Sequence, residues 1–249
     1  MKKLVMMLMT GLMFCALYSQ MLNIVTEEYP PYNYTQNGKV TGVSTEVVEA
    51  VLEVSGLKGK IAVYPWKRAY VMAENDPNTL IYSMGRTPER EAKFKWVGVV
   101  APYDVYLFSL NSRKDIHIKT LDDAKKYKSG TTQNDAREQY LIKKGFKVGD
   151  HIDNSATNAQ NLEKLLINRI DLWPIAELVA KQIVKDKGMD PDKTLAKSFH
   201  IIDLSSDGLY MAFSLSTSDE VVKKFKDGLA KIKKDGTYQR ILKKYNIKM

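Results

Sequence analysis

The stretch "SMGRTPEREAKFKWVGVVAPY", residues 83–103, decides the fold and raises the first functional question. It places Arg86 and Arg90 four residues apart behind one apolar run and ahead of another. Residues at this spacing are neighbours on a helix surface, so the pair is either a solvated feature or a fork that holds a ligand. The residues around the stretch have to distinguish these interpretations.

Strands and helices alternate on both sides of this stretch. Ser44 is expected to cap a helix that Gly56 ends, and Asp235 with Gly236 is expected to divide two closing amphipathic helices. The runs rich in β-branched and aromatic residues, which predict strands, are residues 22–25, 60–66, 79–84, 104–110, 170–173 and 210–215. Such alternation predicts α/β lobes with mostly parallel sheets. Because no linker separates them, the chain should cross between two lobes twice, near residues 102–106 and 204–208.

The first nineteen residues have the layout of a secretory signal peptide. Two lysines precede an apolar run over residues 4–17, which is too short to cross a bilayer, and Ser19 follows. Cys15, the single cysteine, lies in this run, so a lipid-modified N-terminus is an alternative, although the bulky Phe14 disfavours it. Cleavage after Ser19 leaves an exported chain without disulfides or thiolate sites.

The charge of the chain does not indicate nucleic acid. The formal charge is +9 and falls to 9 − 2 = +7 without Lys2 and Lys3, and the remaining lysines are dispersed. For an exported protein this favours a solvated surface, so no nucleic-acid partner is expected. The three histidines are far apart and fit no metal-binding spacing, so we expect no metal and no cofactor.

Four segments in a fixed order resemble the family 3 periplasmic solute-binding proteins, the polar amino-acid receptors of ABC importers. They are "YPPYNYTQNGKVTGVSTEVVEAV" (29–51), "GRTPEREAKFKWVGVVAPY" (85–103), "KSGTTQNDAREQYL" (128–141) and "DGTYQRILKKY" (235–245). The resemblance implies a two-lobed Venus-flytrap fold with two hinge crossings. Its first lobe would comprise residues 20–105 and 207–249, and its second lobe residues 106–206. It also implies a periplasmic monomer that delivers its ligand to a permease of the inner membrane.

The resemblance assigns Arg90 to the carboxylate of the ligand, with Ser83 and Gly85 adding polar contacts. The chemistry agrees, because a planar guanidinium offers two parallel donors to the two oxygens of a carboxylate. Arg86 has no basic counterpart in the best-known members, so a structural role and a second anionic contact both stay open.

Other candidates come from the loops around the expected cleft. The resemblance places Thr131 and Thr132 in a turn before a helix, where free N–H groups suit an anion. Trp66 is expected under the ligand side chain, with Arg68 two residues on. The first loop adds the candidates Glu28 and Tyr32, together with Tyr29.

The chain departs from the family at the aspartate that binds the ligand's ammonium. Five residues past Asp171 stands Ala176, and Glu177 is one step off. Either Glu177 or Glu28 replaces that aspartate, or the ligand has no α-ammonium. A small carboxylate-bearing solute is expected in each case.

Three classes of function share this scaffold. The leading hypothesis is a non-enzymatic receptor that closes around a solute. It acts because the solute binds the closed state more tightly than the open state. The second is an enzyme of the cyclohexadienyl dehydratase type with Glu177 or Glu28 as the acid. The third is a free-standing sensor that signals to a membrane kinase, which would use the same pocket.

Overall fold

The first sheet joins strands from both ends of the chain. A computed structural model describes residues 21–205 and 208–247 and gives this sheet the order β4-β1-β5-β12-β6. The strands are β1 (Leu22–Thr26), β4 (Gly59–Val63), β5 (Thr79–Gly85), β6 (Phe94–Ala101) and β12 (Leu209–Ser214). β1 runs parallel to β4 and β5, whereas β12 runs antiparallel to β5 and β6. β6 leads out of this lobe and β12 returns to it, which is why they run in opposite directions.

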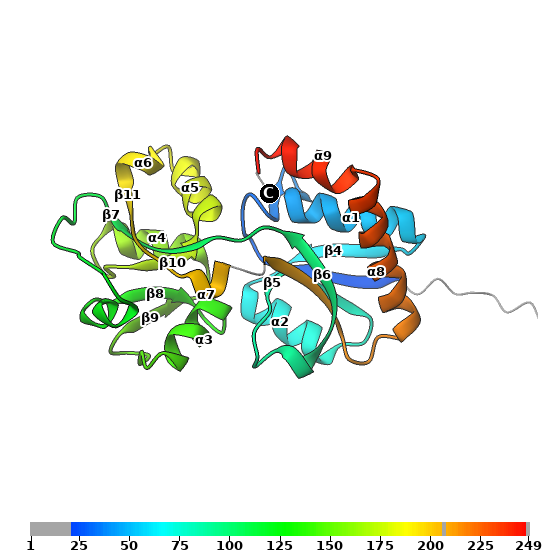
Figure 1. Cartoon of the computed structure of the whole chain (residues 1–249), viewed down its shortest axis with the longest axis horizontal. Helices are drawn as coiled ribbons and strands as arrows, with labels where there is room; N and C mark the ends of the chain where they lie inside the picture. Colours follow the sequence, from blue (N-terminus) through cyan, green and yellow to red (C-terminus); the bar gives the residue numbers. More distant parts are fainter. Residues whose placement is uncertain (1–20, 206–207, 248–249) are drawn as a thin grey trace, which may run out of the picture.

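Helices cover both faces of this sheet and complete the first lobe (Figure 1). The helices α1 and α8 pack on each other, α9 joins them, and α2 lies against β1, β5 and β12 on the other side. Their bounds are α1 (Val43–Ser55), α2 (Trp66–Asn75), α8 (Asp219–Lys234) and α9 (Thr237–Lys244), with the 3₁₀ turn η1 (Glu91–Lys93) and the hairpin of β2 (Tyr34–Gln36) and β3 (Lys39–Thr41). Phe213 of β12 meets Phe225 of α8 edge to face, with ring centroids 5.0 Å apart.

Two of the three expected helix boundaries are met. Gly56 ends α1 in the left-handed region at φ 68°, and Asp235 with Gly236 separates α8 from α9. The cap at Ser44 is wrong: α1 begins after Gly42, and the Ser44 hydroxyl has no hydrogen-bond partner in the described chain. The backbone N–H of Ser44 instead donates to the Tyr32 carbonyl, which anchors the helix start to the first loop.

The second lobe holds two smaller sheets. β7 (Val105–Leu110) lies between β10 (Trp173–Ala176) and β11 (Leu195–His200), antiparallel to both, and β8 (Ser129–Thr132) is parallel to β9 (Ile152–Ser155). Around them lie η2 (Leu121–Lys126), α3 (Ala136–Lys143), α4 (Asn158–Leu166), α5 (Glu177–Asp186), α6 (Pro191–Thr194) and α7 (Ile202–Ser205). The strand expected at residues 170–173 begins at Trp173, because the N–H groups of Asp171 and Leu172 both turn to the Lys128 carbonyl.

Two hydrogen bonds hold the segments at which the chain crosses between the lobes. The Tyr32 hydroxyl donates to the Pro102 carbonyl at 2.8 Å, next to the β6–β7 crossing. The Val105 N–H donates to the Ser205 hydroxyl at 2.9 Å, which joins the outgoing crossing to the end of α7. The two-lobed α/β fold class is confirmed. Antiparallel pairing has a larger share than strand–helix alternation predicts, because β7 and β12 are the crossing strands.

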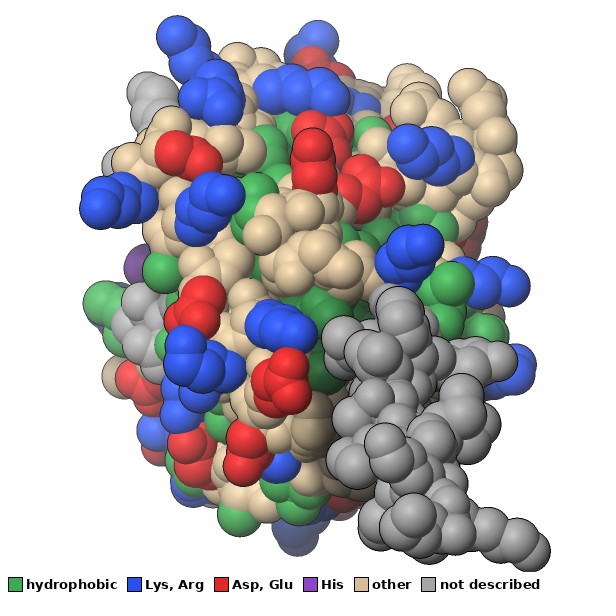
Figure 2. All heavy atoms as spheres, turned by 90° about the vertical axis from the view of Figure 1, so that its right-hand side faces the viewer, with side chains coloured by type: hydrophobic (Ala, Val, Ile, Leu, Met, Phe, Trp, Pro, Cys, Tyr) green, Lys and Arg blue, Asp and Glu red, His purple; other side chains and the backbone are tan. Residues whose placement is uncertain are grey.

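The surface of the first lobe mixes charges of both signs. Figure 2 shows lysines and arginines interspersed with acidic side chains on the end of the molecule formed by this lobe. No helix in residues 21–205 or 208–247 is long and apolar enough to cross a membrane. Within the same residues, no cluster of three or more His, Cys, Asp or Glu side chains could hold a metal ion. The expected signal peptide and Cys15 lie outside the described residues.

Candidate functional site

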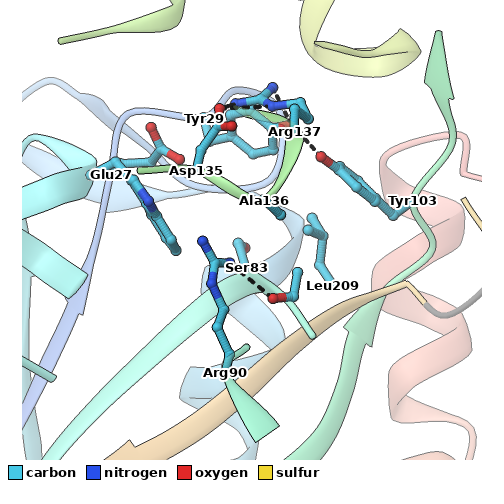
Figure 3. A pocket seen from close by; sticks show the side chains of 11 residues that line it. Glu27, Tyr29, Ser83, Arg90, Tyr103, Asp135, Ala136, Arg137 and Leu209 are labelled. Atoms are coloured by element: carbon cyan, nitrogen blue, oxygen red, sulfur yellow. Dashed lines mark hydrogen bonds and ion pairs between the residues drawn. The ribbon is translucent and has the colours of Figure 1, made fainter. Parts of the chain in front are cut away.

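A small polar cavity lies between the lobes. Its volume is about 20 Å³, enough for roughly one water molecule. The second lobe contributes the start of α3, and the first lobe and the crossing contribute the rest (Figure 3). The lining residues are Glu27, Tyr29, Trp66, Ser83, Gly85, Arg90, Tyr103, Asp135, Ala136, Arg137 and Leu209.

Arg90 enters this cavity from the loop before η1. Its side chain is buried, at 1% exposed, and its guanidinium lies 5.2 Å from the ring centroids of both Trp66 and Tyr70. One terminal nitrogen donates to the Gly85 carbonyl and the other to the Asn134 carbonyl, each at 2.9 Å, and Nε has no partner. Burial lowers the pKa of the guanidinium. Arg90 is therefore a buried cation whose described hydrogen-bond partners are neutral carbonyls.

Asn134 is the point where the second lobe touches this cation. Its carbonyl accepts both from Arg90 and, at 3.1 Å, from the indole nitrogen of Trp66. The residue lies in the left-handed region at φ 61°, a conformation that asparagine tolerates better than most side chains. A backbone oxygen of the second lobe thus accepts the hydrogen bonds that a ligand oxygen could accept.

Asp135 and Arg137 form a buried ion pair at the start of α3. One Asp135 oxygen caps the helix by accepting from the Glu138 N–H at 2.8 Å, and the other accepts from Nε and a terminal nitrogen of Arg137. Arg137 also donates to the Tyr29 hydroxyl of the first lobe at 3.1 Å. Burial disfavours the Arg137 charge, but Asp135 and nearby hydroxyls hold its pKa above the ordinary value. This pair balances itself and adds a second contact between the lobes.

Glu27 is the acid in the cavity that has no cation of its own. It follows β1, is 7% exposed, and receives no hydrogen bond on its carboxyl group from any described residue. Burial raises its pKa from 4.5 to about 8, an effect that Arg137 and Arg90 oppose and Asp135 and Glu28 reinforce. At neutral pH Glu27 is therefore mainly in its neutral form.

Five of the residues expected from the sequence line this cavity: Tyr29, Trp66, Ser83, Gly85 and Arg90. The Ser83 hydroxyl is buried without a described partner, and its backbone has φ 60°. A Cβ at Gly85 would lie 3.0 Å from the Cβ of Ala136, so a glycine lets the second lobe approach closely.

Arg86, Arg68 and Tyr32 lie elsewhere. Arg86 forms a two-pronged pair with Glu91, at 2.8 and 2.5 Å, outside the cavity. Arg68 is exposed and lies 4.5 Å above the Tyr64 ring. Tyr32 packs behind Tyr29, with ring centroids 5.6 Å apart, and belongs to the core. The two arginines of the opening stretch thus diverge, because a nearby acid already occupies the fork of Arg86.

The two threonines expected in the site form hydrogen bonds inside the second lobe instead. The Thr131 hydroxyl donates to Glu138 at 3.4 Å, and the Thr132 hydroxyl donates to Asn158 at 3.2 Å. Both side chains are buried and neither lines the cavity. Residues 134–137, which begin two positions after Thr132, reach the cleft in their place.

The structure places neither Glu28 nor Glu177 at the point where Arg90, Ser83 and Gly85 converge. Glu28 accepts from the backbone and hydroxyl of Thr35, at 3.0 and 2.5 Å, in the β2 hairpin. Glu177 pairs with Lys181 and Lys197 beyond the crossing. These hydrogen bonds and ion pairs hold both carboxylates away from Arg90, and the buried methyl side chain of Ala176 offers no acceptor.

Six cavity residues were missed from the sequence: Glu27, Tyr103, Asp135, Ala136, Arg137 and Leu209. Glu27 directly follows the carboxyl end of a parallel strand, which is where α/β sheets bind ligands. Asp135 and Arg137 belong to the "NDAR" segment, residues 134–137, which begins two residues after β8 ends at Thr132, and an aspartate just before a helix is a typical cap. Both signals are present in the sequence. The site was nevertheless assigned to nearby polar residues, to Glu28 in the first case and to Thr131 and Thr132 in the second.

Comparisons with known proteins agree with this architecture. The family model of the bacterial extracellular solute-binding proteins, family 3, matches residues 22–248. The L-cystine-binding protein TcyJ of Escherichia coli strain K12 is 24% identical over 223 residues, which cover 87% of this chain and 79% of TcyJ.

Solved structures match the fold. An ancestral arginine-binding protein bound to arginine has a TM-score of 0.78 at 21% identity, covering 90% of this chain and 97% of that one. A histidine kinase sensor domain with similarity to periplasmic binding proteins has a TM-score of 0.76 at 20% identity, covering 90% and 95%.

Proposed function

We propose, since this chain belongs to family 3 of the bacterial extracellular solute-binding proteins, that it captures a small carboxylate-bearing solute between its lobes. The solute is an amino acid or an analogue of one. The observation that carries the proposal is Arg90, a fully buried guanidinium that faces the cavity with neutral carbonyls as its partners. A buried charge without a counter-ion costs several kcal/mol, so the site favours an anion from outside.

Arg90 holds the carboxylate by exchanging one partner for another. Its terminal nitrogen leaves the Asn134 carbonyl, and the fork then meets both oxygens of the ligand while the Gly85 contact orients the side chain. The rings of Trp66 and Tyr70, each with its centroid 5.2 Å from the guanidinium, pack against the Arg90 side chain. A charge-assisted pair of this kind contributes about 1.5 to 3 kcal/mol, a factor of roughly ten to one hundred and fifty in affinity.

Glu27 meets the remaining polar group of the solute. An α-ammonium finds no acceptor at Ala176, whereas the Glu27 carboxyl group lines the same cavity as Arg90 and is unpaired in the described chain. The α-ammonium of an amino acid would favour the ionised form of Glu27, which releases its proton to solvent and forms an ion pair with the ammonium. A deaminated analogue would leave the proton in place and accept a hydrogen bond from it.

The biological role that we infer is delivery to an ABC permease from the periplasm, with the chain acting as a monomer. The apolar leader at residues 4–17 supports export, and the relative TcyJ is named as a binding protein. The chain acts by closing around its ligand and performs no chemistry, in line with a family described as solute-binding. The likeness to a kinase sensor domain keeps sensing as the second candidate, since it needs the same pocket.

A thermal-shift screen of the purified chain tests the proposal. Amino acids, their deaminated analogues and small di-acids are the probes, because a ligand at a hundred times its Kd adds about 2.7 kcal/mol of stability. Calorimetry of the best probe with Arg90→Lys should show affinity reduced by about tenfold or more, since the charge remains but the fork is lost. Arg86→Lys is the matched control and should bind like the parent. Unchanged affinity in Arg90→Lys and Arg90→Ala would sink the proposal, as would a screen without any carboxylate hit.

A further inference from the structure

The cavity around Arg90 adjoins a second, larger space. This second hollow has a volume of about 310 Å³ and shares Glu27 and Trp66 with the cavity. A third space of about 460 Å³, the outer groove, shares Pro65 and Ala156 with the second hollow. The cavity and the second hollow therefore border each other at Glu27 and Trp66.

Both lobes build the outer groove. The first lobe contributes the start of α2 from Pro65 to Met72, and the second lobe contributes Gln133 and Ala156. Gln133 immediately precedes Asn134, whose carbonyl contacts Arg90. A ligand in this groove would therefore touch the same two segments that close over the cavity, so its binding and the closure of the lobes depend on each other.

The groove combines an apolar lining with two cations at its rim. Pro65, Val71 and Met72 form apolar wall, and Val71 is 47% exposed. Lys67 and Arg68 are exposed, and within residues 21–205 and 208–247 no carboxylate pairs with either of them. Arg68 lies over the Tyr64 ring instead, with its guanidinium free at the edge. These features are complementary to an apolar chain that ends in an anion.

We propose that the outer groove is a second part of the ligand site, which takes the far end of an elongated solute whose apolar body carries a second anionic group. The inference rests on the proposed capture of a carboxylate by Arg90. The carboxylate head group meets Arg90 in the cavity once the Asn134 contact is released, and the rest of a longer solute lies outside the cavity. The body passes Trp66 and Pro65, and the second anion reaches Lys67 and Arg68.

Binding of straight-chain dicarboxylates tests this directly. The probes are the series from succinate to dodecanedioate and the monocarboxylates of matched chain length, measured by calorimetry on the full chain. Affinity should rise with chain length, and the long dicarboxylates should bind about tenfold tighter than monocarboxylates of equal length, which is the effect of one charge-assisted contact. Equal affinities along the series, or no preference for the second carboxylate, overturn the inference.

Three variants locate the effect. Lys67→Gln combined with Arg68→Gln should abolish the preference for the second carboxylate and leave short monocarboxylates unaffected. Lys60→Gln removes an equally exposed charge of the same lobe and is the control. Ala156→Leu should narrow the passage that the two outer spaces share and weaken long ligands alone. Unchanged binding of long ligands in both the double variant and Ala156→Leu contradicts the inference.

The two proposals fail in different ways. If short monocarboxylates bind through Arg90 and extra length adds nothing, the outer groove is not part of the site and the proposed function stands. If no carboxylate of any length binds, or if Arg90→Lys binds the whole series like the parent, the proposed function itself falls and the inference falls with it.

Discussion

Replacing Glu27 by glutamine should change how the stability of this protein depends on pH. Burial raises the pKa of Glu27 from 4.5 to about 8, with Arg137 and Arg90 opposing the rise. Between these values the unfolded chain releases a proton that the folded chain keeps, so the free energy of unfolding falls as pH rises. The stability that the neutral group provides is complete below pH 4.5 and is lost as pH passes 8.

The magnitude follows from the difference between the two values. Each pKa unit corresponds to about 1.4 kcal/mol, so a change from 4.5 to about 8 sets an upper limit of about 5 kcal/mol. Relaxation and water entry reduce this, and we expect about 2 to 4 kcal/mol for a side chain that is 7% exposed. In a chain of this size that corresponds to a Tm difference of roughly 5 to 15 °C.

Thermal unfolding of the ligand-free parent and of Glu27→Gln from pH 5 to pH 9 provides the measurement. The two proteins should melt together near pH 5, because glutamine resembles the protonated acid, and the variant should melt at the higher temperature near pH 9. Glu28→Gln is the matched control for loss of an adjacent, exposed carboxylate. A Tm difference between the parent and Glu27→Gln that stays constant from pH 5 to pH 9 would refute the assignment of Glu27 as an unpaired buried acid.

Three further outcomes test the packing and the site. Arg86→Gln breaks an exposed pair with Glu91 and should cost at most about 1 kcal/mol in urea unfolding while leaving ligand affinity unchanged; lost affinity would bring Arg86 into the site. Gly85→Ala sets a Cβ 3.0 Å from that of Ala136, so it should hinder closure, lower affinity and shift small-angle scattering toward an open form. An unaltered affinity would show that the lobes do not approach there. Phe213→Ala removes a fully buried ring and should cost about 3 to 5 kcal/mol of unfolding free energy, and a cost below about 1 kcal/mol would contradict its packing.

Local patterns were sufficient for the elements and for part of the site. Periodic apolar residues and glycines located α1, α8 and α9 because these signals act within one turn of chain. The order of four segments predicted two lobes with two crossings. The family resemblance assigned Tyr29, Trp66, Ser83, Gly85 and Arg90 to the site, and all five, which belong to the first lobe, line the cavity.

Choices between chemically similar neighbours depended on the tertiary structure. Glu27 and Glu28 are adjacent carboxylates, and the fold points one into the cavity while Thr35 of the hairpin holds the other outside. Arg86 and Arg90 are both forks, and Glu91 occupies the first. A sequence gives each side chain its chemistry, but the partner that reaches it is set by packing between distant segments.

The contact between the lobes shows this most directly. Asn134 meets Arg90 from 44 residues along the chain, and Arg137 meets Tyr29 from 108 residues away. The sequence by itself, through four segments that resemble a known family, predicted that an arginine and an aromatic wall would face a cleft, because such segments can be identified without their packing partners. Only the closure of one lobe on the other decided that a backbone carbonyl and an Asp–Arg pair complete that cleft, since these contacts form when two separately folded surfaces meet.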